Sequence, residues 1–195
     1  LLESIQVPLG TKMPDFDLPD PSGVKTNSSS YFILRGRACP ASEDHPGIKG
    51  LLVIFTCNHC PYALAVWPRL IKLYQAAEQK GINFVAINPN IHPGYPDDAP
   101  EKMQQKIAEW GIPFPYLIDE SQEVARNFKA QCTPDLFLYN EKQKLAYHGR
   151  IDDNWQDESK VKTRELEDAI DKLSRGLPIS QKQFPSMGCS IKWKD

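Results

Sequence analysis

Two cysteines separated by two residues, Cys57 and Cys60, are the side chains of this sequence best suited to chemistry. Their spacing allows the two sulfurs to close a small disulfide ring. A continuous apolar run at 51–55 ends just before them, and a helical pattern begins at Pro61. The free N–H groups and partial positive charge of a helix start favour a thiolate, and a protonated His59 adds positive charge. We therefore expect an exposed Cys57 with a lowered pKa as the nucleophile and Cys60 as the resolving thiol.

A zinc site is the main alternative for this pair, because C-x-x-C is also a metal-ligand spacing. Zinc requires two further ligands, and a structural site usually supplies a second close pair. The remaining cysteines and histidines are isolated from one another in the sequence: Cys39, Cys132, Cys189, His45, His92 and His148. Folding could still gather some of them, so zinc stays open. A purely structural disulfide is less favoured, since two intervening residues make a strained and reducible loop.

The elements that must position the pair follow from the apolar periodicity of the chain. Continuous apolar runs predict buried strands, and 3.6-residue spacing predicts helices. The predicted strands lie at 51–55, 82–88 and 114–118, and the predicted helices at 61–80, 101–110, 121–128 and 163–173. Alternating segments predict two hairpins, at 13–23 and 136–149, and Pro68 is expected to kink the first helix. This order predicts a single α/β domain over 1–195, with an irregular tail, 177–195, packed on it.

Composition and charge argue against several classes of protein. The chain has 195 residues, with 23 Lys and Arg against 25 Asp and Glu, and a formal net charge of −2. This near-neutral balance argues against nucleic-acid binding, and no apolar run approaches the ~20 residues that a membrane helix requires. Five cysteines are too few for a disulfide-stapled scaffold. The first ten residues lack a secretory pattern, so we expect a cytoplasmic protein, with a trimmed signal segment as the alternative.

Motifs spread over nearly the whole chain resemble the thioredoxin superfamily, on the AhpC/TSA (redoxin) branch that includes peroxiredoxins. The matching segments are GTKMPDF at 10–16, CNHCPY at 57–62, CTPD at 132–135, YHGRIDD at 147–153 and GCSIKW at 188–193. C-x-x-C alone is a weak signal, but with its strand, its helix and a distant Thr-Pro it is a strong one. The resemblance implies a thioredoxin-like fold: a central mixed sheet flanked by helices, an N-terminal hairpin and the extra helix–strand insertion of the peroxiredoxin-like branch.

The resemblance also implies roles for residues around the pair. Pro134 is expected to follow a cis peptide bond and to face the two cysteines, which leaves the backbone of Thr133 open to an extended substrate. Asn58 and His59 lie between the cysteines. In related disulfide oxidases a His at this place makes the disulfide more oxidising, and a solvated His59 with little effect is the alternative.

The other three cysteines receive weaker assignments. Cys132 lies two residues before Pro134 and is expected near the reactive sulfurs. Cys132 and Cys189 are either a second redox pair or two small buried hydrophobes, of which the second is favoured. Cys39, in a loop, is expected to be a free thiol.

Two departures from the family pattern bear on mechanism. Thioredoxins carry a buried Asp six residues before the first cysteine, where this chain has Leu51, so Asp119, Glu120 or a water would have to take the proton of Cys60. The Thr and Pro that precede a peroxidatic cysteine are absent from their usual positions. Residues 152–155 and the loop 90–100, with His92 and Tyr95, either line a substrate groove or serve as caps and solvated surface.

We predict a thiol-disulfide oxidoreductase in which Cys57 and Cys60 exchange disulfides with a protein or a small thiol compound. The alternatives are a thiol peroxidase of the peroxiredoxin type, with an antioxidant role, and a copper or zinc carrier that uses both cysteines and a histidine. No Gly-rich fingerprint or basic pocket indicates a nucleotide or flavin, so no cofactor is expected. The electron donor is expected to be another thiol protein.

Overall fold

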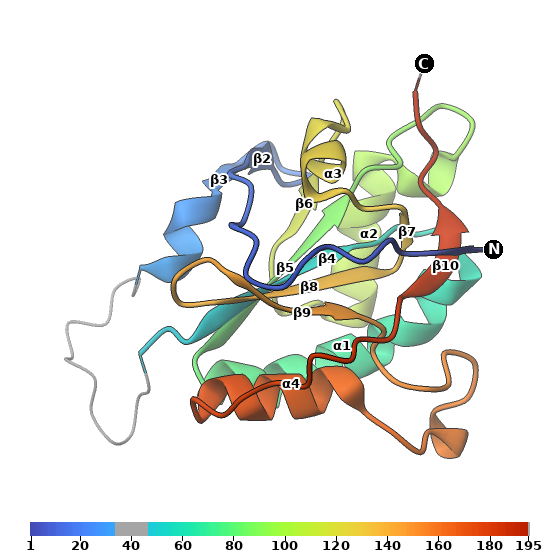
Figure 1. The fold of residues 1–195 in the computed structure, drawn as a ribbon. Coiled ribbons are helices and arrows are strands. Elements are labelled where there is room, and N and C mark those ends of the chain that lie inside the picture. Colours follow the sequence, from blue (N-terminus) through green and yellow to red (C-terminus); the bar gives the residue numbers. More distant parts are fainter. Residues whose placement is uncertain (34–46, 195) are drawn as a thin grey trace.

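The computed structural model describes residues 1–33 and 47–194, so Cys39 and His45 lie outside the described residues. Its centre is a five-stranded sheet in the order β6-β5-β4-β8-β9 (Figure 1). These strands are β4 (Gly50–Phe55), β5 (Ile82–Asn88), β6 (Tyr116–Ile118), β8 (Asp135–Asn140) and β9 (Leu145–Gly149). β4, β5 and β6 run parallel, whereas β8 is antiparallel to both β4 and β9. The sheet is therefore mixed, as expected.

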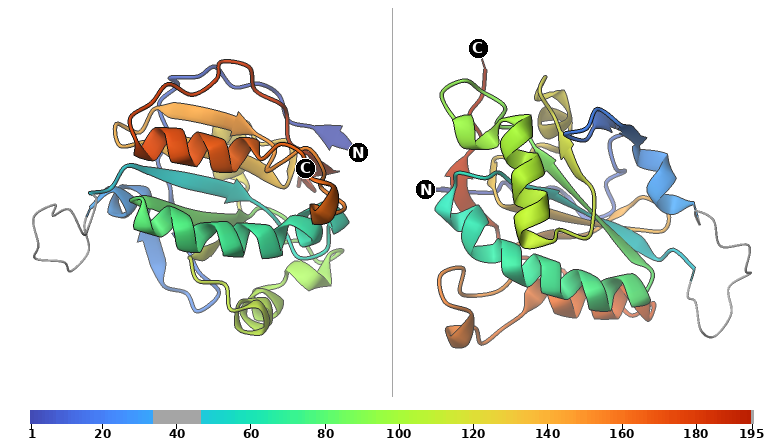
Figure 2. Two further views of the ribbon diagram at one scale, coloured as in Figure 1. Left: turned by 90° about the horizontal axis from the view of Figure 1, so that it is seen from below. Right: turned by 180° about the vertical axis from the view of Figure 1, so that it is seen from behind.

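Helices cover both faces of the sheet because the side chains of β4 alternate between two apolar cores. The helices are α1 (Pro61–Gln79), α2 (Pro100–Trp110), α3 (Glu123–Phe128) and α4 (Glu165–Ser174), with short 3-10 turns η1 (Ser28–Phe32), η2 (Pro96–Asp98) and η3 (Glu158–Lys160). Leu52 and Ile54 lie in a core with α1, α2 and α4, and Figure 2 shows α1 and α4 side by side. Val53 and Phe55 lie in the opposite core, with α3 and the N-terminal segment. Among the described residues, no helix is long and apolar enough to cross a membrane.

Most predicted elements lie within a few residues of their expected places. The two hairpins are β2 (Asp17–Pro19) with β3 (Lys25–Asn27), and β8 with β9. The helix α2 and the strand β6 form the expected helix–strand insertion after β5. The strand expected from 114 begins only at Tyr116, since prolines at 113 and 115 have no N–H to donate to a ladder.

The C-terminal tail contains a strand, so the expectation of an irregular tail is wrong for this part. β10 (Met187–Ser190) pairs antiparallel with β1 (Leu2–Glu3) on one side and with β7 (Cys132–Thr133) on the other. Its four residues, Met-Gly-Cys-Ser, are too few to give a clear periodic signal, and the strand depends on pairing between segments far apart in the chain. β10 also contacts α1 (Figure 1).

Candidate active site

The C-x-x-C pair lies where β4 ends and α1 begins, as the sequence predicted. Cys60 immediately precedes α1, and Pro61 opens the helix. Cys57 and Cys60 are both fully buried, at 0% exposure, and form a small cluster with Ala63. Cys189 of β10 packs against this cluster. The expectation of an exposed Cys57 is therefore wrong, because the C-terminal strand brings its own side chain against the pair.

The loop at Thr133 and Pro134 faces the pair, and the peptide bond between these two residues is cis, as the resemblance implied. Cys57 Sγ lies 3.2 Å from Thr133 Oγ1, and Cys60 Sγ lies 3.2 Å from the Thr133 carbonyl oxygen. The backbone of Thr133 is not open to a substrate, however, because Cys189 of β10 is its partner in the strand register. The chain's own strand occupies the edge expected to be free.

Hydrogen bonding divides the charge of the pair unequally. The pKa of Cys60 is lowered to about 4. The largest cause is hydrogen bonding by the Cys57 thiol, and the Cys189 thiol and N–H groups of β10 and of the first turn of α1 add to it. Burial, the bond to Cys60 and the nearby carboxylate of Asp98 raise the pKa of Cys57 well above its ordinary range. The Cys60 thiol also donates to the carbonyl oxygen of Thr133, 3.2 Å away. The lowered pKa is therefore that of Cys60, whereas the expectation had been a lowered pKa of Cys57.

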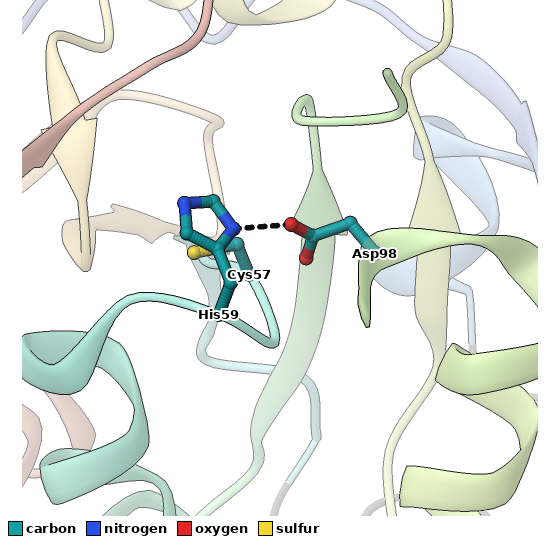
Figure 3. A group of neighbouring side chains, drawn as sticks. All are labelled: Cys57, His59 and Asp98. Carbon is teal, nitrogen blue, oxygen red and sulfur yellow. Dashed lines mark hydrogen bonds and ion pairs between the residues drawn. The ribbon is translucent and has the colours of Figure 1, made fainter. Parts of the chain in front are cut away.

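A buried carboxylate that sequence reasoning missed, Asp98, lies beside Cys57. It ends η2 and is fully buried. Its Oδ1 accepts hydrogen bonds from Asn58 N at 2.6 Å and Asn88 Nδ2 at 3.0 Å, and its Oδ2 pairs with His59 Nδ1 (Figure 3). The sequence signal for this residue is an acidic pair just before a predicted helix, and a helix start without any catalytic role has the same signal.

His59 and Asn58 are both held by neighbouring side chains. The His59 ring stacks on Tyr95, with ring centroids 4.6 Å apart. Asn58 Nδ2 donates to the carbonyl oxygen of Asp97 at 2.9 Å, and Asn58 Oδ1 accepts from the Tyr116 hydroxyl at 3.1 Å. The alternative of a freely solvated His59 is therefore wrong.

Asp119 and Glu120, which were considered as proton acceptors for Cys60, form no hydrogen bond with it among the described residues. Asp119 is buried, but its Oδ2 accepts from the N–H of Ala125 at 2.8 Å and so holds the start of α3. Glu120 is exposed. The charge that acts on the pair comes from Asp98 instead.

Cys132 is buried and faces away from the pair, because neighbouring residues of a strand point to opposite sides and Thr133 faces the sulfurs. Its thiol lies 3.5 Å from the carbonyl oxygen of Pro134 and 4.0 Å from that of Ser186. Burial raises its pKa. Cys132 is therefore a small buried apolar residue, as the favoured alternative had it. Cys189 is only partly buried and does not fit that description.

A cavity of about 250 Å³ adjoins Pro134 on the side of α1. Its lining includes Trp155, Phe184 and Met187, and also Asp152, which forms a buried ion pair with Arg69 of α1. Asp152, Asp153 and Trp155 thus line a cavity beside Pro134, and the expected use of this segment as a substrate groove stays a prediction. His92 and Tyr95, from the other loop, are not part of this lining.

Three of these side chains could together hold a metal ion. The ligand atoms of Cys57, His59 and Asp98 all lie within 4.8 Å of one another. The carboxylate of Asp98 already accepts three hydrogen bonds, however, so a cation would have to displace His59 from it. The arrangement as it stands is a hydrogen-bonded relay that ends beside a thiol.

The fold and this site together define a thioredoxin-like protein with a buried C-x-x-C pair. Residues 8–164 match the Redoxin family, and the chain belongs to that family. A thioredoxin domain of a thiol-disulfide oxidoreductase from Bacteroides vulgatus shares the fold at 14% identity, with a TM-score of 0.59 over 88% of this chain and 99% of that one.

More similar proteins fall into two groups. An uncharacterized conserved protein from Geobacillus kaustophilus is 37% identical, with a TM-score of 0.86 over 99% of this chain and 96% of that one. A hypothetical protein from Sinorhizobium meliloti 1021 is 34% identical, with a TM-score of 0.85 over 98% of each chain. The thiol-disulfide oxidoreductase ResA of Halalkalibacterium halodurans is 28% identical over 104 residues, which is 53% of this chain. This match spans about half of that relative, at 51% of its length.

Proposed function

We propose that this protein is a thiol-disulfide oxidoreductase whose Cys57–Cys60 pair reduces a disulfide of a protein or of a small thiol compound. The observation that carries the proposal is the contact of two buried thiols at the start of α1, each with its sulfur 3.2 Å from an oxygen of Thr133. Membership of the Redoxin family and the similarity to a relative named thiol-disulfide oxidoreductase support it.

In the proposed reaction Cys57 makes the first bond to the substrate. Its proton passes to Cys60 along the hydrogen bond between the two sulfurs, which moves the negative charge to Cys57. Cys57 then attacks one substrate sulfur and releases the other as a thiolate. Cys60 loses the proton, attacks Cys57 Sγ, closes the disulfide ring and releases the second thiolate. Two electrons pass to the substrate, and one proton from the pair and one from solvent complete its two thiols.

Asp98 and His59 are the groups placed to take up the proton that leaves the pair when the disulfide ring closes. They lie within 4.8 Å of Cys57, and their mutual hydrogen bond holds the imidazole in one orientation. A base that is positioned by a third group is the usual arrangement for activating a nucleophile. In this proposal Asp98 takes the place of the buried acid that thioredoxins carry where this chain has Leu51.

Trapping with a chromogenic aromatic disulfide tests the order of attack. The variants are made in a Cys189→Ser background, so that the third sulfur beside the pair cannot interfere. We expect Cys60→Ser to retain one mixed disulfide on Cys57, and Cys57→Ser to retain no stable mixed disulfide. A stable adduct on Cys60 with none on Cys57 would reverse the order. Failure of the unmutated pair to reduce any disulfide would overturn the proposed function.

Two other activities are distinguished by separate measurements. Rapid consumption of hydrogen peroxide with a sulfenic acid on Cys57 would indicate the peroxidase alternative. A metal ion present at one equivalent in the purified protein, and lost in Asp98→Asn, would indicate that Cys57, His59 and Asp98 act as ligands. Neither outcome is expected from a site that transfers electrons between sulfurs.

A further inference from the structure

A third sulfur belongs to this site. Cys189 packs against the buried cluster that contains Cys57 and Cys60. Burial and the neighbouring Cys60 raise the pKa of its thiol to about 11. Cys189 is partly exposed, whereas the other two sulfurs are fully buried. It is therefore the sulfur of the site that a molecule from solvent reaches first.

The strand that carries Cys189 is held in place on both sides of this residue. Before it, Ser186 N donates to Ser4 Oγ at 2.9 Å and Ser186 Oγ donates to the Gly149 carbonyl at 2.7 Å. After it, Ile191 N donates to the Gln131 carbonyl at 3.1 Å. These bonds fix Cys189 against the pair independently of any contact between the sulfurs.

Gly188 shows that the strand is fitted closely to the site. A Cβ at this residue would lie 2.1 Å from the carbonyl oxygen of Thr133 and 2.6 Å from its carbonyl carbon. Only glycine permits this approach of two backbones. The approach brings Cys189 into register with Thr133, whose hydroxyl and carbonyl contact the two sulfurs of the pair.

We propose that Cys189 is a third redox cysteine, which accepts the disulfide of the oxidised pair by forming a bond with Cys60. The inference rests on the proposed function, because the pair must first become oxidised by its substrate. The thiol of Cys189 attacks Cys60 Sγ, the Cys57–Cys60 bond breaks, and the proton of Cys189 ends on Cys57. One disulfide and one thiol are present before and after the step, so no further oxidant or reductant is required.

This exchange carries the disulfide from a buried place to a partly exposed one. A dithiol donor can then attack Cys189 Sγ and release Cys60 as a thiolate. The donor's second thiol frees Cys189 and leaves the donor oxidised. Cys60 is a favourable leaving group because its thiolate is the stabilised one, and low-pKa thiols leave faster.

Disulfide mapping of the full chain tests the proposal. Tryptic cleavage leaves Cys57 and Cys60 on one peptide, 50–69, and places Cys189 on another, 183–192. A bond from Cys60 to Cys189 therefore joins two peptides, whereas the Cys57–Cys60 bond joins none. Folded Cys57→Ser, in a Cys39→Ser background, is oxidised with diamide, which takes up the two electrons and two protons of the dithiol, and is then alkylated and digested. We expect the 50–69 and 183–192 peptides to be joined in most of the protein.

Two variants serve as controls. Cys132→Ser, added to Cys57→Ser, should leave the cross-link unchanged, since Cys132 faces away from the pair. Adding Cys189→Ser should abolish it. If Cys57→Ser keeps its native circular dichroism yet Cys60 and Cys189 both remain alkylated after oxidation, the inference is overturned.

A second readout separates this inference from the proposed function. With Cys57 and Cys60 both present, Cys189→Ser should still reduce a model disulfide in a single turnover, but a dithiol should re-reduce it more slowly than the unmutated chain. Equal re-reduction of Cys189→Ser and the unmutated chain would overturn the inference and leave the proposed function standing. A chain that forms the Cys60–Cys189 bond but reduces no disulfide through its pair would instead overturn the proposed function.

Discussion

At the scale of single residues, the different charges of Cys57 and Cys60 have their cause in the groups around each sulfur. Cys60 receives donors from two thiols and two backbone N–H groups, whereas Cys57 faces the carboxylate of Asp98. A thiolate is stabilised by donors and opposed by a like charge. The first proton therefore leaves from the second cysteine of the motif.

The thiolate absorbance of the reduced protein near 240 nm tests this assignment. We expect about one thiolate at pH 7, with a transition near pH 4 that disappears in Cys60→Ser, because Cys57 alone has a raised pKa. Cys132→Ser is the control and should leave the transition unchanged. Persistence of the transition in Cys60→Ser, with its loss in Cys57→Ser, would place the charge on Cys57 instead.

The role of Asp98 is tested by Asp98→Asn, which keeps the shape of the side chain and removes its charge. We expect the rate of disulfide reduction near neutral pH to fall by about 10²-fold, because proton transfer loses its base. The pKa of Cys57 should also fall, since the carboxylate that raises it is gone. The measurement is the pH profile of the rate.

Asp97→Asn is the matched control for this prediction. Asp97 is exposed and contributes its backbone carbonyl, not its side chain, to the bond with Asn58. Its variant should behave as the unmutated chain. Equal pH profiles for Asp98→Asn and Asp97→Asn would show that Asp98 only holds the loop.

At the scale of elements, β10 adds a strand to β7 in the way that an extended peptide adds to a sheet edge. The result is a site closed by the chain itself, with Cys189 in the register of Thr133. A substrate that reaches Cys57 must therefore displace or pass this strand. The cavity beside Pro134 adjoins this strand, because Met187 of β10 is part of its lining.

Gly188→Ala tests how closely the strand must fit. The added methyl group meets the Thr133 carbonyl, so we expect a loss of about 1–3 kcal/mol of unfolding free energy and faster alkylation of Cys60. Chemical denaturation and timed alkylation measure the two effects. Gly47→Ala is the control, because a Cβ there meets nothing within 4 Å. Unchanged alkylation in Gly188→Ala would mean that β10 does not shield the pair.

Elements whose residues carry local periodicity could be predicted from the sequence. The continuous apolar run before Cys57 gave β4 nearly to the residue, and 82–88 gave β5, because strands buried on both faces need apolar side chains throughout. The position of the pair between β4 and α1 followed from the same patterns. β10 could not be predicted, since its stability comes from partners that lie more than fifty residues away in the sequence.

The chemistry around the pair was less predictable than its position. Burial of Cys57 follows from β10 and could not be known before the tail was placed. Asp98 approaches the pair from a loop forty residues along the chain, through hydrogen bonds to Asn58 and His59. Such contacts depend on tertiary folding and leave no periodic signal in the sequence.

At the scale of the whole molecule, the protonation of the reduced pair is linked to the free energy of unfolding. Between pH of about 4 and 9.0, folded Cys60 is a thiolate, whereas in the unfolded chain it is a thiol. The unfolded state then binds more protons, so the unfolding free energy of the reduced protein rises with pH. The raised pKa of Cys57 has the opposite effect on the unfolding free energy. Its contribution to stability is fully present below the ordinary thiol pKa and is lost as the pH rises above that range.

Denaturant unfolding of the reduced and oxidised proteins tests this linkage. We expect the stability of the reduced form, relative to the oxidised form, to increase from pH 5 to pH 8. The oxidised pair has no thiol to titrate, and the carboxylates common to both forms cancel in the difference. Cys60→Ser forms no Cys57–Cys60 disulfide, so it is compared with the reduced unmutated chain, and its stability should lack the increase from pH 5 to pH 8 that Cys60 contributes. A difference that stays constant from pH 5 to pH 8 would contradict the lowered pKa of Cys60.

The pairing of β1 with β10 also has a mechanical consequence. Leu2 lies opposite Gly188 and Glu3 opposite Met187, so residue 1 and the segment after Ser190 leave the pair on the same side. Tension applied between Leu1 and Lys194 therefore opens this pair one residue at a time, as a zipper opens, rather than by shear. At the other end, the bonds of Lys192 to Asn90 and of Lys194 to Gln122 bear the load first, and β10 with Cys189 is loaded after them.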